Sequence, residues 1–394
     1  MPFLVTVSAR VGRNCLVQIG DMPTYPTTAA SIGGLVPASS DLLINLAYLN
    51  QEATGLSHYG LQLVPHLIRI LHPVLLSPCR WPGATTLQIP NNMTAIQGLQ
   101  GHLRRLIWTQ TQLGQIYHQI GSRLLFSPVP EAPLGQSIRK VITVHDLIPL
   151  RFPSRSFSTL YFRSHLPRLL KESTHIFCNS QATAQDLQSF YQVPEQRLTI
   201  TPLACDRQQF RPLRLDRRNY FVYVGRLNPY KNLQRLIKAF ALIQRQLDCE
   251  LWLVGPVDRR FLPAVQAQIE AQGLTEVVRF KNYVPRKELP IILNQAIALV
   301  HPSLWEGFGL TVLEAMSCGT PVLVADRSSL PEVVGDAGLY FDPLQPEAIA
   351  ESMQAIAQDS GLQQRLSAAA LARSQQFSWE RTSRITIQQL QALL

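Results

Sequence analysis

Short apolar segments alternate with helical patterns along most of the chain. In the first half, residues 41–49, 139–150 and 173–180 include apolar runs of the length expected for buried strands. Residues 52–71 combine a glycine-containing loop with a helical pattern. Residues 99–120 form a second helical pattern, because apolar positions recur at spacings of three, four and seven. These positions are Leu99, Leu103, Leu106, Leu113 and Ile120.

The same alternation is clearer in the second half. A stripe of apolar residues predicts a helix over 232–247, formed by Leu233, Leu236, Ile237, Phe240, Ile243 and Leu247. Strands are predicted within 220–227, 249–255, 277–284, 296–303, 320–326 and 338–343. Alternation of buried strands with helices predicts an α/β protein with parallel, doubly wound sheets. Ligands of such sheets bind beyond the carboxyl ends of the strands, so the loops after strands are where chemistry is expected.

The chain length predicts two domains. A chain of 394 residues is longer than a domain built around a single hydrophobic core usually is. We place Rossmann-like domains at 41–208 and 209–376, and a C-terminal helix at 377–394. Residues 1–40 are rich in Ser, Thr, Gly and Pro and lack the basic start and apolar core of a signal peptide. We expect them to be a disordered extension or the result of a start codon assigned too far upstream.

Charge is unevenly distributed between the two halves. Residues 1–208 carry 16 Lys or Arg and 9 Asp or Glu, a net charge of +7. Residues 209–394 carry 20 Lys or Arg and 17 Asp or Glu, a net charge of +3, so that the formal charge of the chain is +10. A basic first half favours anionic partners such as lipid headgroups, phosphorylated acceptors or nucleic acid, although a basic surface can also serve solubility alone. Nucleic acid is not expected, because no module combining aromatic and basic residues is present.

Cysteine spacing and hydropathy favour a cytoplasmic protein. The six cysteines form no C-x-x-C or Cys/His metal spacing, so reduced thiols are expected. No apolar run reaches the ~18 residues that a membrane-spanning helix needs. Arg104, Arg105 and Trp108 share one predicted helix and could dock on anionic lipid. Contact with a membrane is therefore expected to be peripheral, at the inner face of the plasma membrane.

A loop with two cations follows the predicted strand in 221–224. In GRLNPYKN, Arg226 and Lys231 could grip a diphosphate, because Arg forks onto phosphate oxygens and Lys acts as a point charge. The alternative is a solvated loop with ordinary surface cations. The chain has no P-loop, no G-x-G-x-x-G and no D-x-D pair to hold a metal on the diphosphate. We therefore expect no metal site and no cofactor, and assign charge neutralisation to these cations and a helix start.

Two carboxylates flank a glycine turn in SLWEGFGLTVLEAM. Gly307 and Gly309 permit close backbone approach, and the following helix start presents free N–H groups that suit an anion. Glu306 lies beside that anion site, and Glu314 lies more than a turn inside the helix. Carboxylates placed near a phosphate can bind hydroxyl groups of a sugar or ribose. The alternatives are an exposed loop acid for Glu306 and an ion-paired helix acid for Glu314.

A histidine and an aspartate end the predicted strand in 141–146. His145, followed by Asp146, occupies a position where doubly wound sheets place active groups, and it could bind a hydroxyl or relay a proton. A core histidine bonded to a carbonyl is the equally weighted alternative.

The segments VITVHDLIPL, YVGRLNPYKNLQRLIKAF and HPSLWEGFGLTVLEAMSCGTPVLVADRSSLPEVVGDAGLYFDP together resemble glycosyltransferase family 4, retaining enzymes of the GT-B fold. The resemblance spans residue 41 to the end and is closest in kind to bacterial mannosyltransferase-like proteins. It implies an acceptor-binding first domain, a donor-binding second domain and a C-terminal helix that crosses back to the first. The implied reaction moves a hexose, with mannose and GDP-mannose favoured, onto a glycan or lipid-linked acceptor without a metal.

The resemblance also implies roles for individual residues. Arg226 and Lys231 would hold the donor diphosphate, Glu314 the ribose, and His145 would lie at the reacting sugar. The sugar and distal phosphate would be held by Glu306, Gly307, Phe308, Gly309 and Leu310. Thr54 and Gly55 would belong to a loop near donor or acceptor.

Two segments depart from the family pattern. ATGLSHYG has Ser57 and His58 where the family is richer in glycine, and TPLACD has Ala204 and Cys205 at positions that commonly hold Gly and a β-branched residue. A catalytically silent nucleotide-sugar-binding or scaffolding protein of the same fold is therefore the second hypothesis.

Overall fold

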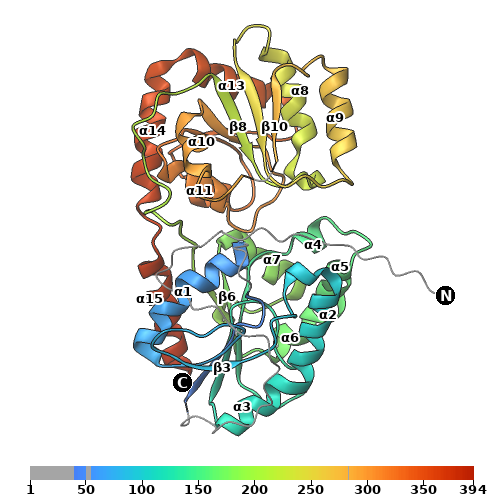
Figure 1. Ribbon diagram of the computed structural model, residues 1–394, viewed down its shortest axis with the longest axis vertical. Coiled ribbons are helices and arrows are strands. Elements are labelled where there is room, and N and C mark those ends of the chain that lie inside the picture. The colour runs from blue at the N-terminus through green and yellow to red at the C-terminus, as the bar shows by residue number, and fades with distance from the viewer. Residues whose placement is uncertain (1–39, 50–54, 283) are drawn as a thin grey trace, which may run out of the picture. The chain divides into compact units, whose positions relative to one another are not determined.

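A computed structural model describes residues 40–49, 55–282 and 284–394. The expectation for residues 1–40 and the assignment of Thr54 lie outside the described residues, apart from Ser40. The first half contains a seven-stranded parallel sheet with the order β3-β2-β1-β4-β5-β6-β7 (Figure 1). Its strands are β1 (Leu42–Asn45), β2 (Val74–Ser77), β3 (Thr85–Gln88), β4 (Leu124–Ser127), β5 (Lys140–Val144), β6 (His175–Cys178) and β7 (Leu198–Ile200).

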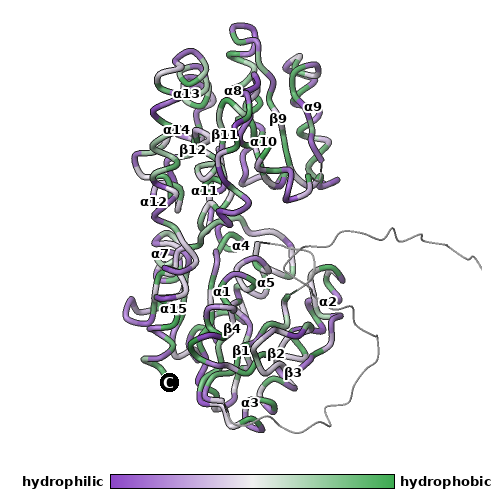
Figure 2. The backbone as a smooth tube through the Cα atoms, turned by 60° about the vertical axis from the view of Figure 1, so that its left-hand side comes forward, coloured by the Kyte–Doolittle hydropathy of each residue, from purple (hydrophilic) through white to green (hydrophobic). Residues whose placement is uncertain are grey.

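The second half contains a six-stranded parallel sheet with the order β10-β9-β8-β11-β12-β13. Its strands are β8 (Tyr220–Val224), β9 (Glu250–Val254), β10 (Val278–Lys281), β11 (Ala298–His301), β12 (Val322–Ala325) and β13 (Leu339–Phe341). Both sheets confirm the predicted α/β, doubly wound class. The central strand β12 (VLVA) is apolar throughout, and β11 (ALVH) is apolar up to its last residue, His301, because helices cover both faces of each sheet (Figure 2).

Helices surround both sheets. Those of the first half are α1 (Gly55–Leu71), α2 (Gly98–Trp108), α3 (Gly114–Ile120), α4 (Ile148–Arg151), α5 (Phe157–Ser164), α6 (Leu166–Glu172) and α7 (Gln181–Tyr191). Those that follow are α8 (Leu233–Ile243), α9 (Leu262–Ala271), α10 (Leu289–Gln295), α11 (Leu310–Ser317), α12 (Leu330–Val334), α13 (Pro346–Gln358), α14 (Ser360–Ser374) and α15 (Trp379–Leu393). No helix in the described part of the chain is both long and apolar enough to span a membrane.

Strand geometry divides the first half into two apolar cores. Along β1, Leu42 and Ile44 belong to one core and Leu43 to the other. The division arises because successive strand side chains point to opposite faces. A third core fills the second half around both faces of its sheet. Each buried Leu or Ile contributes about 1.5–3 kcal/mol relative to exposure, so the sheets hold the loops at their carboxyl ends on a rigid support.

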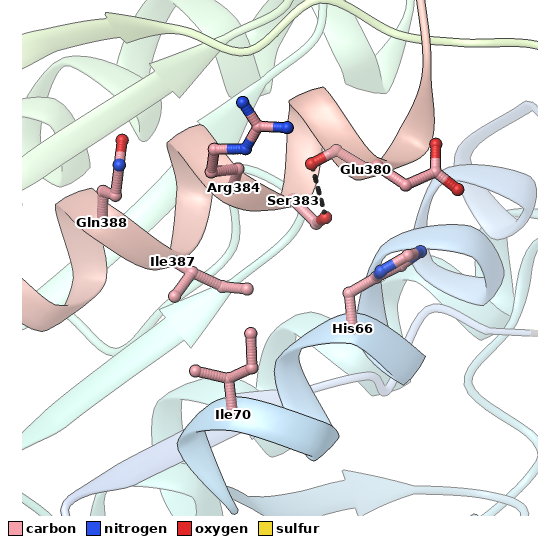
Figure 3. A pocket seen from close by; sticks show the side chains of 7 residues that line it. All are labelled: His66, Ile70, Glu380, Ser383, Arg384, Ile387 and Gln388. Carbon is pink, nitrogen blue, oxygen red and sulfur yellow. Dashed lines mark hydrogen bonds between the residues drawn. The ribbon is translucent and has the colours of Figure 1, made fainter.

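The C-terminal helix α15 packs against α1. Trp379, Ile387 and Leu390 of α15 share a core with Leu63 and Val64 of α1. A hollow of about 270 Å³ lies along this contact (Figure 3). Residues of the two helices line the hollow: His66, Ile70, Glu380, Ser383, Arg384, Ile387 and Gln388. None of the site residues implied by the family resemblance is among them. The hollow therefore reflects the fit of two helices and is separate from the candidate site.

The helical prediction over 99–120 is correct in type but wrong in its buried face. The segment forms α2, a π-helical turn (Thr109–Leu113) and α3. The extra residue per turn in the π segment rotates the helix face. Leu113 and Ile120 are buried as expected, whereas Leu99 and Leu103 are 57% and 39% exposed.

Candidate active site

Glu306 lies in the loop between β11 and α11 and is buried. Its Oε1 accepts hydrogen bonds from Lys231 Nζ at 2.5 Å and from His301 Nε2 at 2.7 Å. Lys231 follows β8 and His301 ends β11, and these strands are neighbours in the sheet. Adjacent parallel strands end at the same edge, so the sheet itself brings this cluster together.

Polar contacts fix the backbone on both sides of the cluster. Asn232 adopts a left-handed conformation with φ of 63°, and its amide donates to the carbonyls of Pro302 at 3.1 Å and Pro343 at 2.7 Å. The backbone N–H of Glu306 donates to Ser328 Oγ at 3.0 Å. These bonds hold Lys231 and Glu306 in one geometry before any ligand binds.

The buried pair is ionised. Burial alone would raise the pKa of the Glu306 carboxyl, but Lys231 and His301 outweigh it and hold that pKa well below its ordinary value. Burial alone would lower the pKa of the Lys231 ammonium, but Glu306 and Tyr230 raise it above its ordinary value. The two shifts agree, because each charge stabilises the other in a poorly solvated place.

The glycine turn after Glu306 requires glycine at two positions. Gly309 has a φ of 99° and caps α11, which L side chains rarely tolerate. A Cβ on Gly307 would lie 2.2 Å from the carbonyl oxygen of His145. The Gly307 carbonyl accepts a bond from Ser180 Oγ at 2.6 Å. Ser180 also caps α7 as an N-cap, accepting from the backbone N–H of Thr183.

Free backbone donors follow Gly307. In the described part of the chain, no acceptor receives the backbone N–H groups of residues 307–311. The side chains of this segment serve packing, because Phe308 is buried against Phe377 and Leu310 lies against the core. The turn and the start of α11 therefore present a row of N–H donors and the positive end of a helix dipole, a combination that suits an anion.

Glu314 is buried within α11 and forms an ion pair. Its Oε1 accepts from Arg286 Nη2 at 2.8 Å, and Arg286 lies after β10. Burial raises the pKa of the Glu314 carboxyl above its ordinary value, and Arg286 partly offsets that rise. Arg286 also lies 5.0 Å from the Phe210 ring and 3.5 Å from His58 Nε2. The ion-paired helix acid considered from the sequence is thus present, with a partner that the sequence pattern did not identify.

His145 is placed at the carboxyl end of β5, as expected. Its Nε2 lies 2.9 Å from the Pro128 carbonyl oxygen, so this nitrogen is the protonated donor. The ring contacts Tyr59 edge to face at 4.8 Å. Burial lowers the pKa of His145 to about 4, so the imidazole is neutral near pH 7. A carbonyl-bonded histidine is what the structure shows, and its Nδ1 has no bond to the described residues.

The remaining candidates are less tightly held. Arg226 is exposed in the same loop as Lys231, and its guanidinium makes no ion pair within the described residues. Gly55 is the first residue of α1, and a Cβ there would meet nothing within 4 Å. No group of three or more His, Cys, Asp or Glu in residues 40–49, 55–282 and 284–394 could hold a metal ion.

Sequence reasoning missed His301, Arg286 and Asn232. His301 could have been found by the rule that singled out His145, because it also ends an apolar strand. Arg286 and Asn232 carry no such signal, because the partner of Arg286 lies 28 residues away and those of Asn232 lie 70 and 111 residues away.

The stability of the protein is expected to decrease as the pH falls from about 6.5 to about 4. Burial lowers the pKa values of His58, His145 and His175 from 6.5 to about 4. The unfolded chain would therefore bind protons that the folded chain does not, and acid favours unfolding across this window. The thermal midpoint at pH 7 and at pH 5 measures the loss. His175→Asn should shrink the difference, and His118→Asn, at an exposed position, should not. An equal loss in both variants would contradict the assignment.

Family comparisons cover both halves of the chain. Residues 61–209 match the family model described as Glycosyltransferase Family 4, and residues 206–373 match the one described as Glycosyl transferases group 1. The chain is 32% identical over 263 residues to the O-antigen chain mannosyltransferase B of Escherichia coli, covering 63% of this chain and 69% of that relative. It is 26% identical over 313 residues to the O-antigen chain mannosyltransferase RfbU of Salmonella typhimurium, covering 77% and 87%.

Solved structures share the fold. Sucrose-phosphate synthase from Thermosynechococcus elongatus aligns with a TM-score of 0.71 at 19% identity, covering 90% of this chain and 99% of that one. Anabaena HepE, solved with UDP and glucose, aligns with a TM-score of 0.68 at 18% identity, covering 89% and 99%. At these identities the likeness concerns the fold.

Proposed function

Because the chain belongs to glycosyltransferase family 4 and has the GT-B fold, we propose that it moves a hexose, with mannose favoured, from a nucleotide-diphosphate sugar to a glycan or lipid-linked acceptor. Membership of this family shows that the chain is a glycosyltransferase. The donor, the acceptor and the residue roles below are the proposal.

The observation that carries the proposal is the position of the Lys231–Glu306 pair beside the free N–H groups of residues 307–311. A cation and a helix start suit a diphosphate, and a carboxylate between them suits the hydroxyl groups of the attached sugar. Lys231, Arg226 and the helix start would hold the diphosphate. Glu306 would accept from sugar hydroxyls, and the donors of the glycine turn and Leu310 would bind the distal phosphate.

The nucleotide and the reacting sugar extend this arrangement. Glu314 would accept from the ribose, and the free Nδ1 of His145 would accept from a sugar hydroxyl. We place transfer with retention here: the bond from the sugar C1 to the phosphate oxygen breaks, a bond from C1 to the acceptor oxygen forms, and the acceptor proton passes to the leaving diphosphate. Relatives named as mannosyltransferases and a neighbour solved with UDP and glucose support a nucleotide sugar, with GDP-mannose favoured.

The direct test is transfer or donor hydrolysis by the purified full chain across GDP- and UDP-sugars. We expect one donor to be turned over and its nucleoside diphosphate to bind. Binding without turnover on any donor, with glycan and lipid-linked acceptors supplied, would favour the silent nucleotide-sugar-binding alternative. The observation behind that alternative is Ser57 and His58, both buried in the first turn of α1 where the family carries more glycine.

Transfer is expected to proceed at the same rate, within about twofold, with and without EDTA. The physical reason is that Arg226, Lys231 and the start of α11 supply positive charge to the leaving diphosphate. Initial rates at saturating donor measure the effect, with Mg²⁺ restored as the control. Loss of activity in EDTA that Mg²⁺ restores would contradict the assignment of charge neutralisation to these groups.

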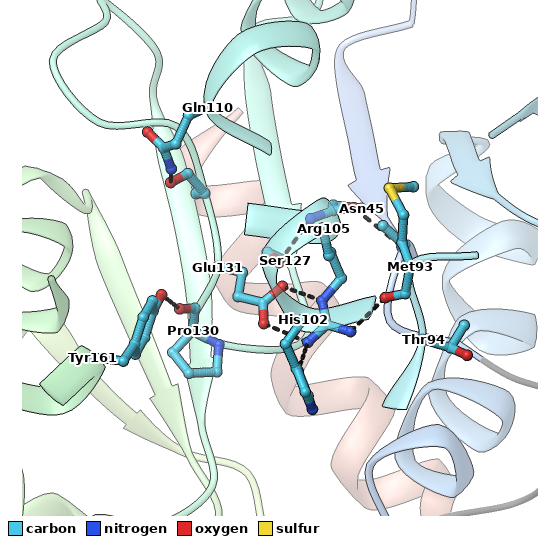
Figure 4. A network of polar contacts seen from close by, with 12 residues as sticks. Asn45, Met93, Thr94, His102, Arg105, Gln110, Ser127, Pro130, Glu131 and Tyr161 are labelled. Atoms are coloured by element: carbon cyan, nitrogen blue, oxygen red, sulfur yellow. Dashed lines mark hydrogen bonds and ion pairs between the residues drawn. The ribbon is translucent and has the colours of Figure 1, made fainter. Parts of the chain in front are cut away.

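We also place the enzyme in the cytoplasm, at the inner face of the plasma membrane when its acceptor is lipid-linked. The surface first considered for lipid contact needs correction, because Arg105 is buried at 5% exposure. Its guanidinium pairs with Glu131 at 2.6 Å and donates to the Met93 carbonyl at 2.7 Å (Figure 4). Arg105 is therefore a structural residue of the first half and is unavailable to a membrane.

A further inference from the structure

One side of α2 is apolar and uncovered. Ile96, just before the helix, is 56% exposed, and Leu99, Leu103 and Ile107 are 57%, 39% and 62% exposed. At about 100° per residue Leu99, Leu103 and Ile107 fall within an arc of roughly 80° on α2. Ile96 lies in the 3-10 turn that precedes the helix (Ala95–Gln97). Arg104 is exposed about 60° beyond that arc, and Arg105 points to the opposite side. We call Leu99, Leu103, Arg104 and Ile107 the α2 face.

The α2 face is rigidly attached to the loop that reaches the candidate active site. Glu131 and Met93 hold Arg105, and the carbonyl of Pro130 accepts from Tyr161 of α5 at 2.6 Å (Figure 4). The carbonyl of Pro128, two residues earlier, contacts His145. One short loop therefore joins α2 and α5 to the histidine at the carboxyl end of β5.

Positively charged residues predominate in this part of the sequence. Residues 95–171 contain ten Lys or Arg and two Asp or Glu. Both acids are engaged, because Glu131 pairs with Arg105 and Asp146 accepts from the backbone N–H of Ile148. The cations of this segment that are exposed and have no ion pair within the described residues are Arg104, Arg139, Arg155, Arg163, Arg168 and Lys171.

We propose that the α2 face is the surface that docks on an anionic lipid bilayer. An apolar row inserts at the boundary of headgroups and acyl chains, while nearby cations bind lipid phosphates, and neither feature alone gives stable attachment. A second copy of the chain is a poorer occupant, because a two-fold contact would place the same uncompensated cations opposite each other. Nucleic acid would leave the aliphatic row unused.

The proposal rests on the proposed function in one respect only. Docking serves to bring a lipid-linked acceptor toward the loop at His145. The attachment itself needs no donor or acceptor. It is therefore measured separately from transfer.

The test is flotation of the full chain with vesicles of phosphatidylcholine alone and with about one third phosphatidylglycerol. We expect binding to the anionic vesicles that weakens at high salt, because screening shortens the reach of the charges to a few ångströms. The double variant Leu99→Ser with Ile107→Ser, and separately Arg104→Glu with Arg163→Glu, should each reduce binding about tenfold or more. Donor hydrolysis in solution should stay unchanged in both, because none of these residues belongs to the candidate site.

Matched controls lie on α8 and just after it. Leu242 is 51% exposed and Arg245 is exposed, so Leu242→Ser and Arg245→Glu alter comparable side chains elsewhere and should bind vesicles like the unchanged protein. Equal binding to neutral and anionic vesicles, or unchanged binding by both double variants, would overturn the proposal. A dimer in light scattering that the Leu99 and Ile107 changes convert to a monomer would assign the face to a second copy and overturn it as well.

Discussion

Replacing Glu306 by Gln is expected to lower the rate of sugar transfer by about a hundredfold or more, a size typical of losing one preorganised electrostatic contact at a reacting centre. The amide keeps the shape of the side chain but removes the charge that faces Lys231 and His301. Nucleotide affinity should stay the same or increase, because Lys231 is released to the diphosphate. Turnover at saturating donor and calorimetry with the nucleoside diphosphate measure the two effects.

Stability measurements separate this effect from misfolding. Removing one member of a buried ion pair destabilises by about 3–5 kcal/mol because the other charge is left uncompensated. Lys231→Met and Glu306→Gln should therefore each lower the thermal midpoint, and the double variant should lower it by less than their sum. Glu276→Gln, at an exposed acid, is the matched control. If the Glu306→Gln variant transfers sugar at the normal rate, the role of Glu306 is purely structural.

Replacing Glu314 by Gln is expected to weaken nucleotide binding about tenfold to a hundredfold. A hydrogen bond to a charged group contributes about 1.5–3 kcal/mol, and 1.4 kcal/mol corresponds to a factor of ten. If the carboxylate binds the ribose, the variant should also lose most of its discrimination between a ribonucleotide and its 2′- and 3′-deoxy analogues. Calorimetry with these three ligands gives the comparison, and the transfer rate at saturating donor should change much less.

Arg286→Met tests the competing explanation that Glu314 serves only its ion pair. This variant removes the partner at 2.8 Å but keeps the carboxylate. Under the ribose assignment, Arg286→Met retains discrimination against deoxy analogues while Glu314→Gln loses it. If both variants lower the thermal midpoint alike and neither changes discrimination, Glu314 is an ion-paired helix acid and the ribose role is wrong.

Much of the fold could be predicted from local patterns. The segments with strand composition in the second half correspond to β8 through β13, because strands covered on both faces must be apolar at consecutive positions. The helix over 99–120 shows where such reasoning stops. Its apolar spacing is compatible with several buried faces, and the π-helical turn and the anchoring of Arg105 to Glu131 decided which one packs inward.

The candidate site likewise contains residues that could be predicted from the sequence and contacts that could not. His145, Glu306 and the glycines were predictable because they lie in loops that follow apolar strands, and such loops form the ligand edge of a parallel sheet. The partners of the carboxylates were not predictable, since they depend on which strands are neighbours. Lys231 meets Glu306 across 75 residues because β8 lies beside β11.

Taken by itself, the sequence determined the class of fold, the family and the segments that carry chemistry, because hydrophobic period and strand-end residues are local properties of the chain. Only the tertiary structure decided that Glu306 shares its charge with Lys231 and His301, that Glu314 faces Arg286, and that α2 leaves an apolar row uncovered. The physical reason is that ion pairing and burial depend on strand order and helix rotation, which join residues far apart in the chain.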